Sequence, residues 1–147
     1  MPDDLPLLDR HEVLVAAPAR AVWEALPSAL PGPSAVPYAW AVGADPARVS
    51  GVVPDEGATV PGFRVAEAVP DRRLHLSGRH RFSRYALTFT LEAVAGGTLL
   101  GAVSHAEFPG VLAGLYRLAV VGTGAHGVLV PGMLRSVRRR AQRRRVS

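Results

Sequence analysis

The chain has 147 residues, of which 48% are hydrophobic, and this length and composition fit one globular domain with a sizeable core. Cysteine is absent, which excludes disulfides, thiolate catalysis and cysteine-ligated metals. The net charge of +5 is concentrated at one end, because seven of the 17 basic residues lie between Arg135 and Arg145 and no acid follows Glu107. The part before Arg135 carries ten basic and twelve acidic residues, a net charge of −2, so no nucleic-acid partner is expected.

The first part of the chain is predicted to form a strand, a short helix and an irregular segment. Apolar and polar residues alternate over residues 9–16, which is typical of a strand. Pro18 then opens a helix that runs through Leu26 and is ended by the prolines that follow. Residues 27–61 show no clear periodicity. Acidic residues stand where a signal peptide carries positive charge, so we expect a cytoplasmic protein.

The central part of the chain is predicted to be a set of antiparallel strands. Residues 62–68 and 73–77 are strand candidates, separated by the turn-like pair Pro70-Asp71. Residues 83–108 then form a hairpin, because apolar and polar residues alternate strictly from residue 84 to residue 92.

The hairpin is predicted to turn at Gly96-Gly97, since two adjacent glycines suit a two-residue turn. This register pairs large inward-facing side chains with partners on the second strand, namely Leu91 with Ala102, Phe89 with Ser104, Leu87 with Ala106 and Tyr85 with Phe108. Large residues on one strand therefore face mostly small ones on the other. The pattern predicts a cavity beside the apolar face of the hairpin.

The C-terminal part is predicted to be helical. Apolar residues recur at helical spacing from Val111 onward, and Gly122, Gly124, Pro131 and Gly132 predict a broken or kinked helix. The apolar run from residue 111 to residue 130 has the length of a membrane span, but Arg117 lies near its middle. A helix packed against a sheet is therefore the preferred interpretation.

The order of strand, helix, several antiparallel strands and terminal helix resembles the START-like helix-grip superfamily, which includes polyketide cyclases and lipid carriers. The resemblance is carried by four features: His11 to Val15, Pro18 with Val22-Trp23, the strand Tyr85 to Leu91, and the terminal helix. It implies an α+β fold in which a curved antiparallel sheet grips a long C-terminal helix around a ligand cavity. The domain would span residues 1–147, with an arginine-rich end at 135–147. Pro131-Gly132 departs from the uninterrupted helix usual in that superfamily, and the resemblance carries over no catalytic residue.

Eight residues are predicted to bind a ligand in or beside this cavity: Tyr85, Leu87, Phe89, Ser104, Phe108, Tyr116, His80 and Arg84. The hydroxyl groups among them are expected to point inward, and the alternative is core packing with local hydrogen bonds. The basic residues between positions 79 and 84 are interpreted as a rim that favours an anionic ligand group. A solvated turn is the alternative interpretation of that cluster.

Two further motifs are not assigned a function. Residues 122–127 match G-x-G-x-x-G, but a dinucleotide site needs an acidic residue about 20 positions further on, and none follows. No cofactor is therefore expected. His105 and Glu107 share one face of their strand, but two groups do not complete a metal site, so no metal is expected either.

The leading functional hypothesis is the binding or carriage of a small apolar or amphipathic ligand without chemistry. The alternative is a cyclase-like enzyme acting on a hydrophobic substrate, in which Tyr85 or His80 assists proton transfer. The sequence leaves open which of the two applies. A third interpretation is an interaction module whose arginine-rich end makes weak contacts with anionic surfaces.

Overall fold

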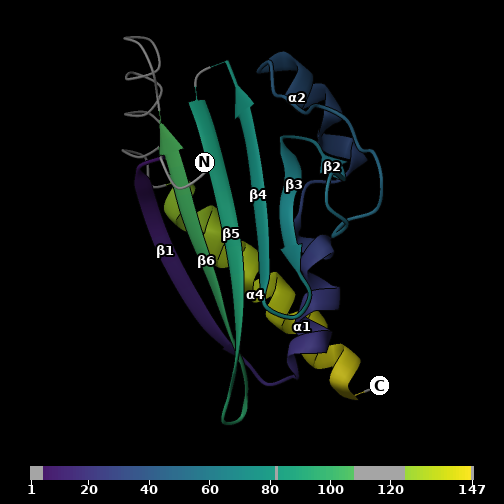
Figure 1. Cartoon of the computed structure of the whole chain (residues 1–147), viewed down its shortest axis with the longest axis vertical. Coiled ribbons are helices and arrows are strands. Elements are labelled where there is room, and N and C mark those ends of the chain that lie inside the picture. Colours follow the sequence, from purple (N-terminus) through teal and green to yellow (C-terminus); the bar gives the residue numbers. More distant parts are fainter. Residues whose placement is uncertain (1–4, 82, 108–124, 147) are drawn as a thin grey trace.

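A computed structural model describes residues 5–81, 83–107 and 125–146, with the side chains of 125–129 and 144–146 left out of the description. Over these residues the chain forms an α+β fold with one six-stranded antiparallel sheet in the order β1-β6-β5-β4-β3-β2. The curved sheet wraps around the C-terminal helix, and a short N-terminal helix lies beside that helix (Figure 1). The predicted fold class is confirmed.

The strands are β1 (Leu7–Val15), β2 (Thr59–Val60), β3 (Phe63–Val69), β4 (Arg73–His80), β5 (Ser83–Val94) and β6 (Gly97–Glu107). The helices are α1 (Ala19–Ala25), η2 (Leu26–Ala29), η3 (Pro33–Ala35), α2 (Val36–Ala41) and α4 (Ala125–Val146). Each of η2, η3 and α2 has a proline in its first two positions. Proline suits a helix start but not a helix interior, so the proline-rich segment after α1 becomes a chain of short helical turns.

The predicted register of the β5–β6 hairpin is wrong by two residues. Phe89 pairs with Ala102 and Leu87 pairs with Ser104, and the turn residues are Ala95 and Gly96. Because side chains alternate with a period of two, an even shift leaves every residue on its predicted face. The inward and outward assignments of the hairpin therefore hold although the pairs differ.

The two adjacent glycines serve different purposes, which explains the shifted register. Gly96 has a φ of +87°, a left-handed conformation that glycine adopts without steric cost in a tight turn. Gly97 instead begins β6 where β1 ends, and a Cβ atom there would collide with the carbonyl oxygen of Val15. Gly97 is thus needed for the close approach of two strands rather than for the turn.

The concave face of the sheet is densely packed at one end, which we call the closed end and define by Leu74, Leu76, Phe89, Leu100 and Ala102. All five side chains are fully buried, with 0% of their surface exposed. They belong to one core cluster with Val22 of α1, Leu26 of η2 and Val137 of α4. The helices therefore seal this end of the sheet.

Helix α4 is continuous over the described residues 125–146, so the predicted break is not found there. Pro131 lies within it and removes one backbone hydrogen bond. Gly122 and Gly124 precede the helix and lie outside the described residues. The buried side chains Val130, Leu134, Val137 and Ala141 recur every three or four residues and form the face that contacts the sheet. None of the helices in the described part of the chain has the length and apolar character needed to cross a membrane.

The last turn of α4 is tied to the end of β1 by one side chain. Gln142 Oε1 accepts a hydrogen bond from the backbone N–H of Ala16 at 3.0 Å. We expect Gln142→Ala to lower the free energy of unfolding by about 1 kcal/mol, the usual net value of such a bond. Removal of residues 143–147 should leave it unchanged, as measured by urea denaturation. An equal loss of unfolding free energy in both variants would show that the terminal arginines also stabilise the fold. The weak contact of these arginines with anionic surfaces stays a prediction.

Candidate ligand-binding site

A hollow of about 450 Å³ lies between the concave face of the sheet and α4, beyond the closed end. The residues that line it are Leu8, Ala29, Leu30, Pro31, Tyr38, Phe63, His80, Ser83, Tyr85, Ala86, Leu87, Ser104, His105, Ala106, Val130 and Met133. Within the described part of the chain, this lining includes no aspartate, glutamate, lysine or arginine. The hollow is therefore uncharged as long as its histidines are neutral.

The hollow exists because β6 offers small side chains where β5 and α4 stand apart. Ser104 lies beside Leu87, and Ala106 lies beside Tyr85. Serine and alanine do not fill the space that a larger side chain would occupy at these positions. Met133 of α4 lines the opposite side of the hollow. The contrast of large and small residues that the sequence shows thus produces open space at this end of the hairpin.

One end of the hollow is polar and is built around Tyr85. The Tyr85 hydroxyl donates a hydrogen bond to the carbonyl oxygen of Gly62 at 2.7 Å. The ring of Phe63 meets the tyrosine ring edge-on, with centroids 5.3 Å apart and planes at 68°. Gly78 lies opposite Tyr85, and a Cβ atom there would collide with Gly62. Glycine at position 78 therefore allows the tyrosine and the Gly62 carbonyl to meet.

His80 and Ser83 complete this polar end, where β4 turns into β5. His80 Nε2 lies 3.1 Å from the hydroxyl oxygen of the buried Ser83, within hydrogen-bond distance. The imidazole ring also lies beside Tyr85, with centroids 5.6 Å apart. Burial lowers the pKa of His80 below its ordinary value of 6.5, because desolvation disfavours the charged form. His80 is therefore neutral at neutral pH.

This lowered pKa makes the stability of the fold depend on pH. Below the ordinary pKa of 6.5, His80 takes up a proton more readily in the unfolded chain than in the folded one. We expect the free energy of unfolding to fall as the pH drops through this range, and His80→Gln to reduce that slope. Urea denaturation of both proteins between neutral and mildly acidic pH measures it. If His80→Gln leaves the slope of unfolding free energy against pH unchanged, the lowered pKa of His80 is not the cause of that slope.

The structure brings together four of the eight predicted binding residues. Tyr85, Leu87, Ser104 and His80 all line the hollow. Phe89 lies further along β5, at the closed end, and is completely buried in the core. It therefore packs beneath the hollow rather than lining it.

Arg84, a predicted rim residue, points to the other face of the sheet, which we call the outer face. It pairs across the strands with Glu107, and their side chains form an ion pair at 3.4 Å. Strand alternation is the reason, because Arg84 stands between the inward-facing Ser83 and Tyr85. Phe108 and Tyr116, the remaining predicted residues, lie outside the described part of the chain.

Other lining residues were not predicted from the sequence. Leu30, Pro31 and Tyr38 come from the proline-rich segment, which has no periodicity that would indicate an inward face. Phe63 begins β3, and its pattern of alternation could have placed it on the concave face. Over the described residues, no group of three or more histidine, aspartate or glutamate side chains could hold a metal ion. Residues 122–124 of the glycine motif lie outside the description, and 125–127 form the start of α4.

Comparisons with known proteins support the fold. No protein-family model matches the chain, and no curated protein matches it in sequence. Protein MLL2253 from Mesorhizobium loti is 17% identical, with 92% of this chain and 96% of that chain covered and a TM-score of 0.58. Protein CV1439 from Chromobacterium violaceum is 18% identical, with 90% and 96% covered and a TM-score of 0.56.

A third solved structure is that of the di-domain ARO/CYC StfQ from the steffimycin biosynthetic pathway. It is 16% identical and has a TM-score of 0.58, and the match covers 99% of this chain and 54% of that one. This chain therefore spans about half of the length of StfQ. At these identities the likeness shows a shared fold, and the fold is one that a polyketide ARO/CYC also has.

Proposed function

We propose that this protein binds a small, neutral, amphipathic molecule in the hollow between its sheet and α4. The observation that carries the proposal is the distribution of polarity around the hollow. His80, Ser83 and Tyr85 gather hydrogen-bonding groups at one end, while Leu87 and Met133 belong to an apolar wall. A ligand with one polar group and an apolar body matches this arrangement.

The size of the hollow is consistent with a small organic molecule. Its volume of about 450 Å³ falls within the range of about 300–1,000 Å³ that is typical of ligand pockets. At the polar end, Tyr85 donates a hydrogen bond to Gly62 and His80 lies against Ser83. A phenolic oxygen is an acceptor as well as a donor. A ligand hydroxyl group could donate to it.

The absence of charge from the described lining predicts a preference for neutral ligands. Burying an unpaired carboxylate costs far more free energy than burying a hydroxyl group that finds a hydrogen bond. We therefore expect 2-naphthol to bind at least about tenfold more tightly than 2-naphthoate, which has a similar shape but a negative charge. Titration followed by ligand fluorescence at neutral pH measures both. Equal affinities, or no binding of either compound, would contradict the proposal.

A second experiment identifies a natural occupant without assuming its structure. Native mass spectrometry of the purified protein should show a complex with a co-purified small molecule. That complex should be lost under denaturing conditions, because the ligand is held without a covalent bond.

A cyclase-like enzyme is the second candidate function. It is favoured by the contact between His80 and Tyr85 inside the hollow and by the neutral state of His80, which leaves the imidazole able to accept a proton. Membership of the START-like superfamily is likewise an inference, supported by the shared fold with StfQ. Turnover of a polyketide-like substrate that is lost in Tyr85→Phe or His80→Ala, with 2-naphthol binding retained, would support the enzyme over a carrier. Absence of turnover in the wild type would leave carriage as the function.

A further inference from the structure

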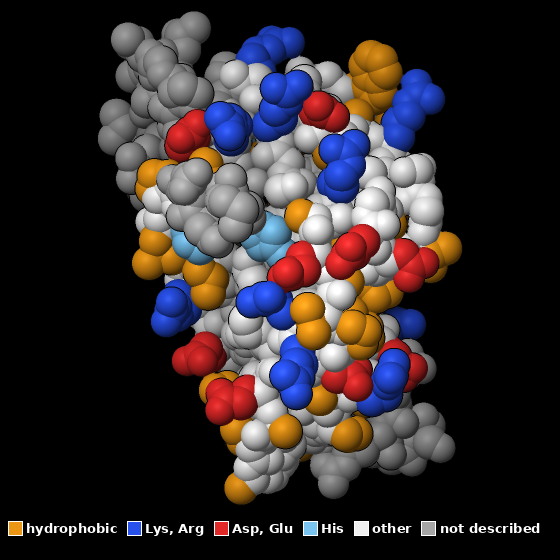
Figure 2. Space-filling model, viewed as in Figure 1, with side chains coloured by type: hydrophobic (Ala, Val, Ile, Leu, Met, Phe, Trp, Pro, Cys, Tyr) orange, Lys and Arg blue, Asp and Glu red, His pale blue; other side chains and the backbone are white. Residues whose placement is uncertain are grey.

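A second hollow, of about 360 Å³, lies on the outer face of the sheet, opposite the first. Three adjacent strands, β3, β4 and β5, form its floor, and Leu5 and Asp45-Pro46 line its sides. Figure 2 shows this face, where arginine side chains, with acidic side chains among them, lie over the upper part and histidine side chains are visible beneath them. We call this space the outer hollow.

Small residues stand side by side on the floor of the outer hollow. Arg64, Ser77 and Ala86 occupy one row across β3, β4 and β5, so serine and alanine are neighbours in the middle of the sheet. The outer face of a sheet usually carries larger polar side chains that cover the backbone. Here the arginines stand at the margin, while Ser77 is partly exposed and Ala86 is buried.

Three arginines line the outer hollow, one from each of the three strands: Arg64, Arg79 and Arg84. Among the described residues, Arg64 has no acid within ion-pair distance. Arg79 directs Nε and Nη2 at one oxygen of Asp45, at 3.4 and 3.3 Å, which leaves its Nη1 group available. The closest approach of Arg84 to Glu107 is 3.4 Å, from Nη1. Both pairs are exposed, and exposed ion pairs are weak enough for an anionic ligand to compete.

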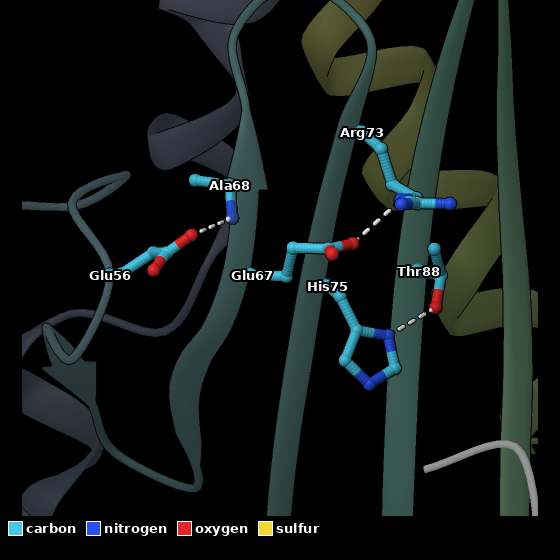
Figure 3. Close-up of polar contacts among 6 residues, drawn as sticks. All are labelled: Glu56, Glu67, Ala68, Arg73, His75 and Thr88. Atoms are coloured by element: carbon cyan, nitrogen blue, oxygen red, sulfur yellow. Dashed lines mark hydrogen bonds and ion pairs between the residues drawn. The ribbon is translucent and has the colours of Figure 1, made fainter. Parts of the chain in front are cut away.

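The hollow also has a polar side near His75, where no acidic side chain of the described residues lines it. His75 lines the hollow, is 9% exposed, and places Nδ1 2.7 Å from the hydroxyl oxygen of Thr88 (Figure 3). The nearest acid along this part of the sheet, Glu67, is engaged by Arg73 at 2.8 Å. Asp45 is therefore the one acidic residue in the described lining, against three arginines.

We propose that the outer hollow binds a small organic anion through a phosphate or carboxylate group held by Arg64, Arg79 and Arg84. The guanidinium group presents donors in a planar fork that matches both anions. The remainder of the molecule would lie against the partly exposed Ser77. This site lies on the opposite face of the sheet from the proposed ligand-binding hollow, and Tyr85 and Ala86 of β5 line both.

Titration of the 15N-labelled full chain with inorganic pyrophosphate and, separately, with citrate tests this site. Amide shifts should change at residues 64, 77 and 79, which line the outer hollow alone, in a saturable manner, and the two probes show whether phosphate or carboxylate is preferred. Arg64→Gln should weaken binding about tenfold, and added sodium chloride should weaken it further. Arg10→Gln is the matched control, because Arg10 is also exposed on a strand, has no described ion-pair partner and does not line the hollow.

Two outcomes would overturn the proposal. Shift changes that stay linear up to high probe concentration would show that there is no site, and equal weakening by Arg64→Gln and Arg10→Gln would show only general attraction to positive charge. A further variant, Ser77→Val, fills the floor without changing the charge and should reduce binding. Its circular dichroism and melting temperature show whether it is folded. Arg64 is exposed, so the Arg64→Gln test does not depend on that result.

Discussion

Replacing Ser104 with phenylalanine is expected to abolish the binding of 2-naphthol while leaving most of the stability intact. Ser104 is buried, but its side chain borders the hollow beside Leu87, so a larger side chain there has space to enter. A phenylalanine ring would occupy the volume that the ligand needs. Fluorescence titration and urea denaturation of the variant measure the two effects separately.

Ala102→Phe is the matched control, because Ala102 lies two residues away on the same face of β6. It is fully buried opposite Phe89, at the closed end. Overpacking a filled core costs about 1–3 kcal/mol. Ala102→Phe should therefore be less stable than Ser104→Phe. If both variants lose the same stability, and the wild type binds no 2-naphthol, the hollow is not a ligand site.

Phe89→Ala is expected to have the largest effect on stability of any single change on β5. The ring is completely buried among the residues of the closed end, and such a truncation costs about 3–5 kcal/mol through lost burial and the cavity left behind. That is a large share of the stability of a domain of this size, for which about 5–15 kcal/mol is typical. Urea denaturation measures the loss, with the same slope of unfolding free energy against urea concentration (m value) used to fit both proteins.

Leu87→Ala is the comparison for this prediction. Leu87 lies one inward position away and already borders open space, so its removal should cost about 2 kcal/mol, the low end of the range for leucine. It should also change ligand affinity, which Phe89→Ala affects only through stability. A larger loss in Leu87→Ala than in Phe89→Ala would contradict the division of β5 into a packed end and an open end.

Much of the fold followed from local patterns in the sequence. The alternation around Tyr85, Leu87 and Phe89 correctly assigned the inward face of β5. It also fixes Arg84 on the outer face, and the predicted rim position of Arg84 conflicted with that alternation. The turn was misplaced because the sequence does not show that Gly97 is required by the approach of Val15, a residue 82 positions earlier in the chain.

The remainder of the hollow beside α4 depends on contacts between distant segments. Leu30, Pro31 and Tyr38 reach it from a segment whose prolines remove any helical or strand period. The outer hollow arises from a row in which Arg64, Ser77 and Ala86 become neighbours only after three strands pair. Pairing registers of this kind are determined by tertiary packing, and local propensity does not encode them.

The division of the concave face into a packed end and an open end has a consequence for how this protein can change over evolution. Residues that hold the domain together, such as Phe89 and Leu100, lie toward one end of β5 and β6. Residues that border the hollow, such as Leu87 and Ser104, lie toward the other end of the same two strands. Substitutions at the open end are expected to alter the shape of the hollow at a smaller cost in stability than substitutions at the closed end. The shape of the hollow can therefore change with less need for compensating stability elsewhere in the domain.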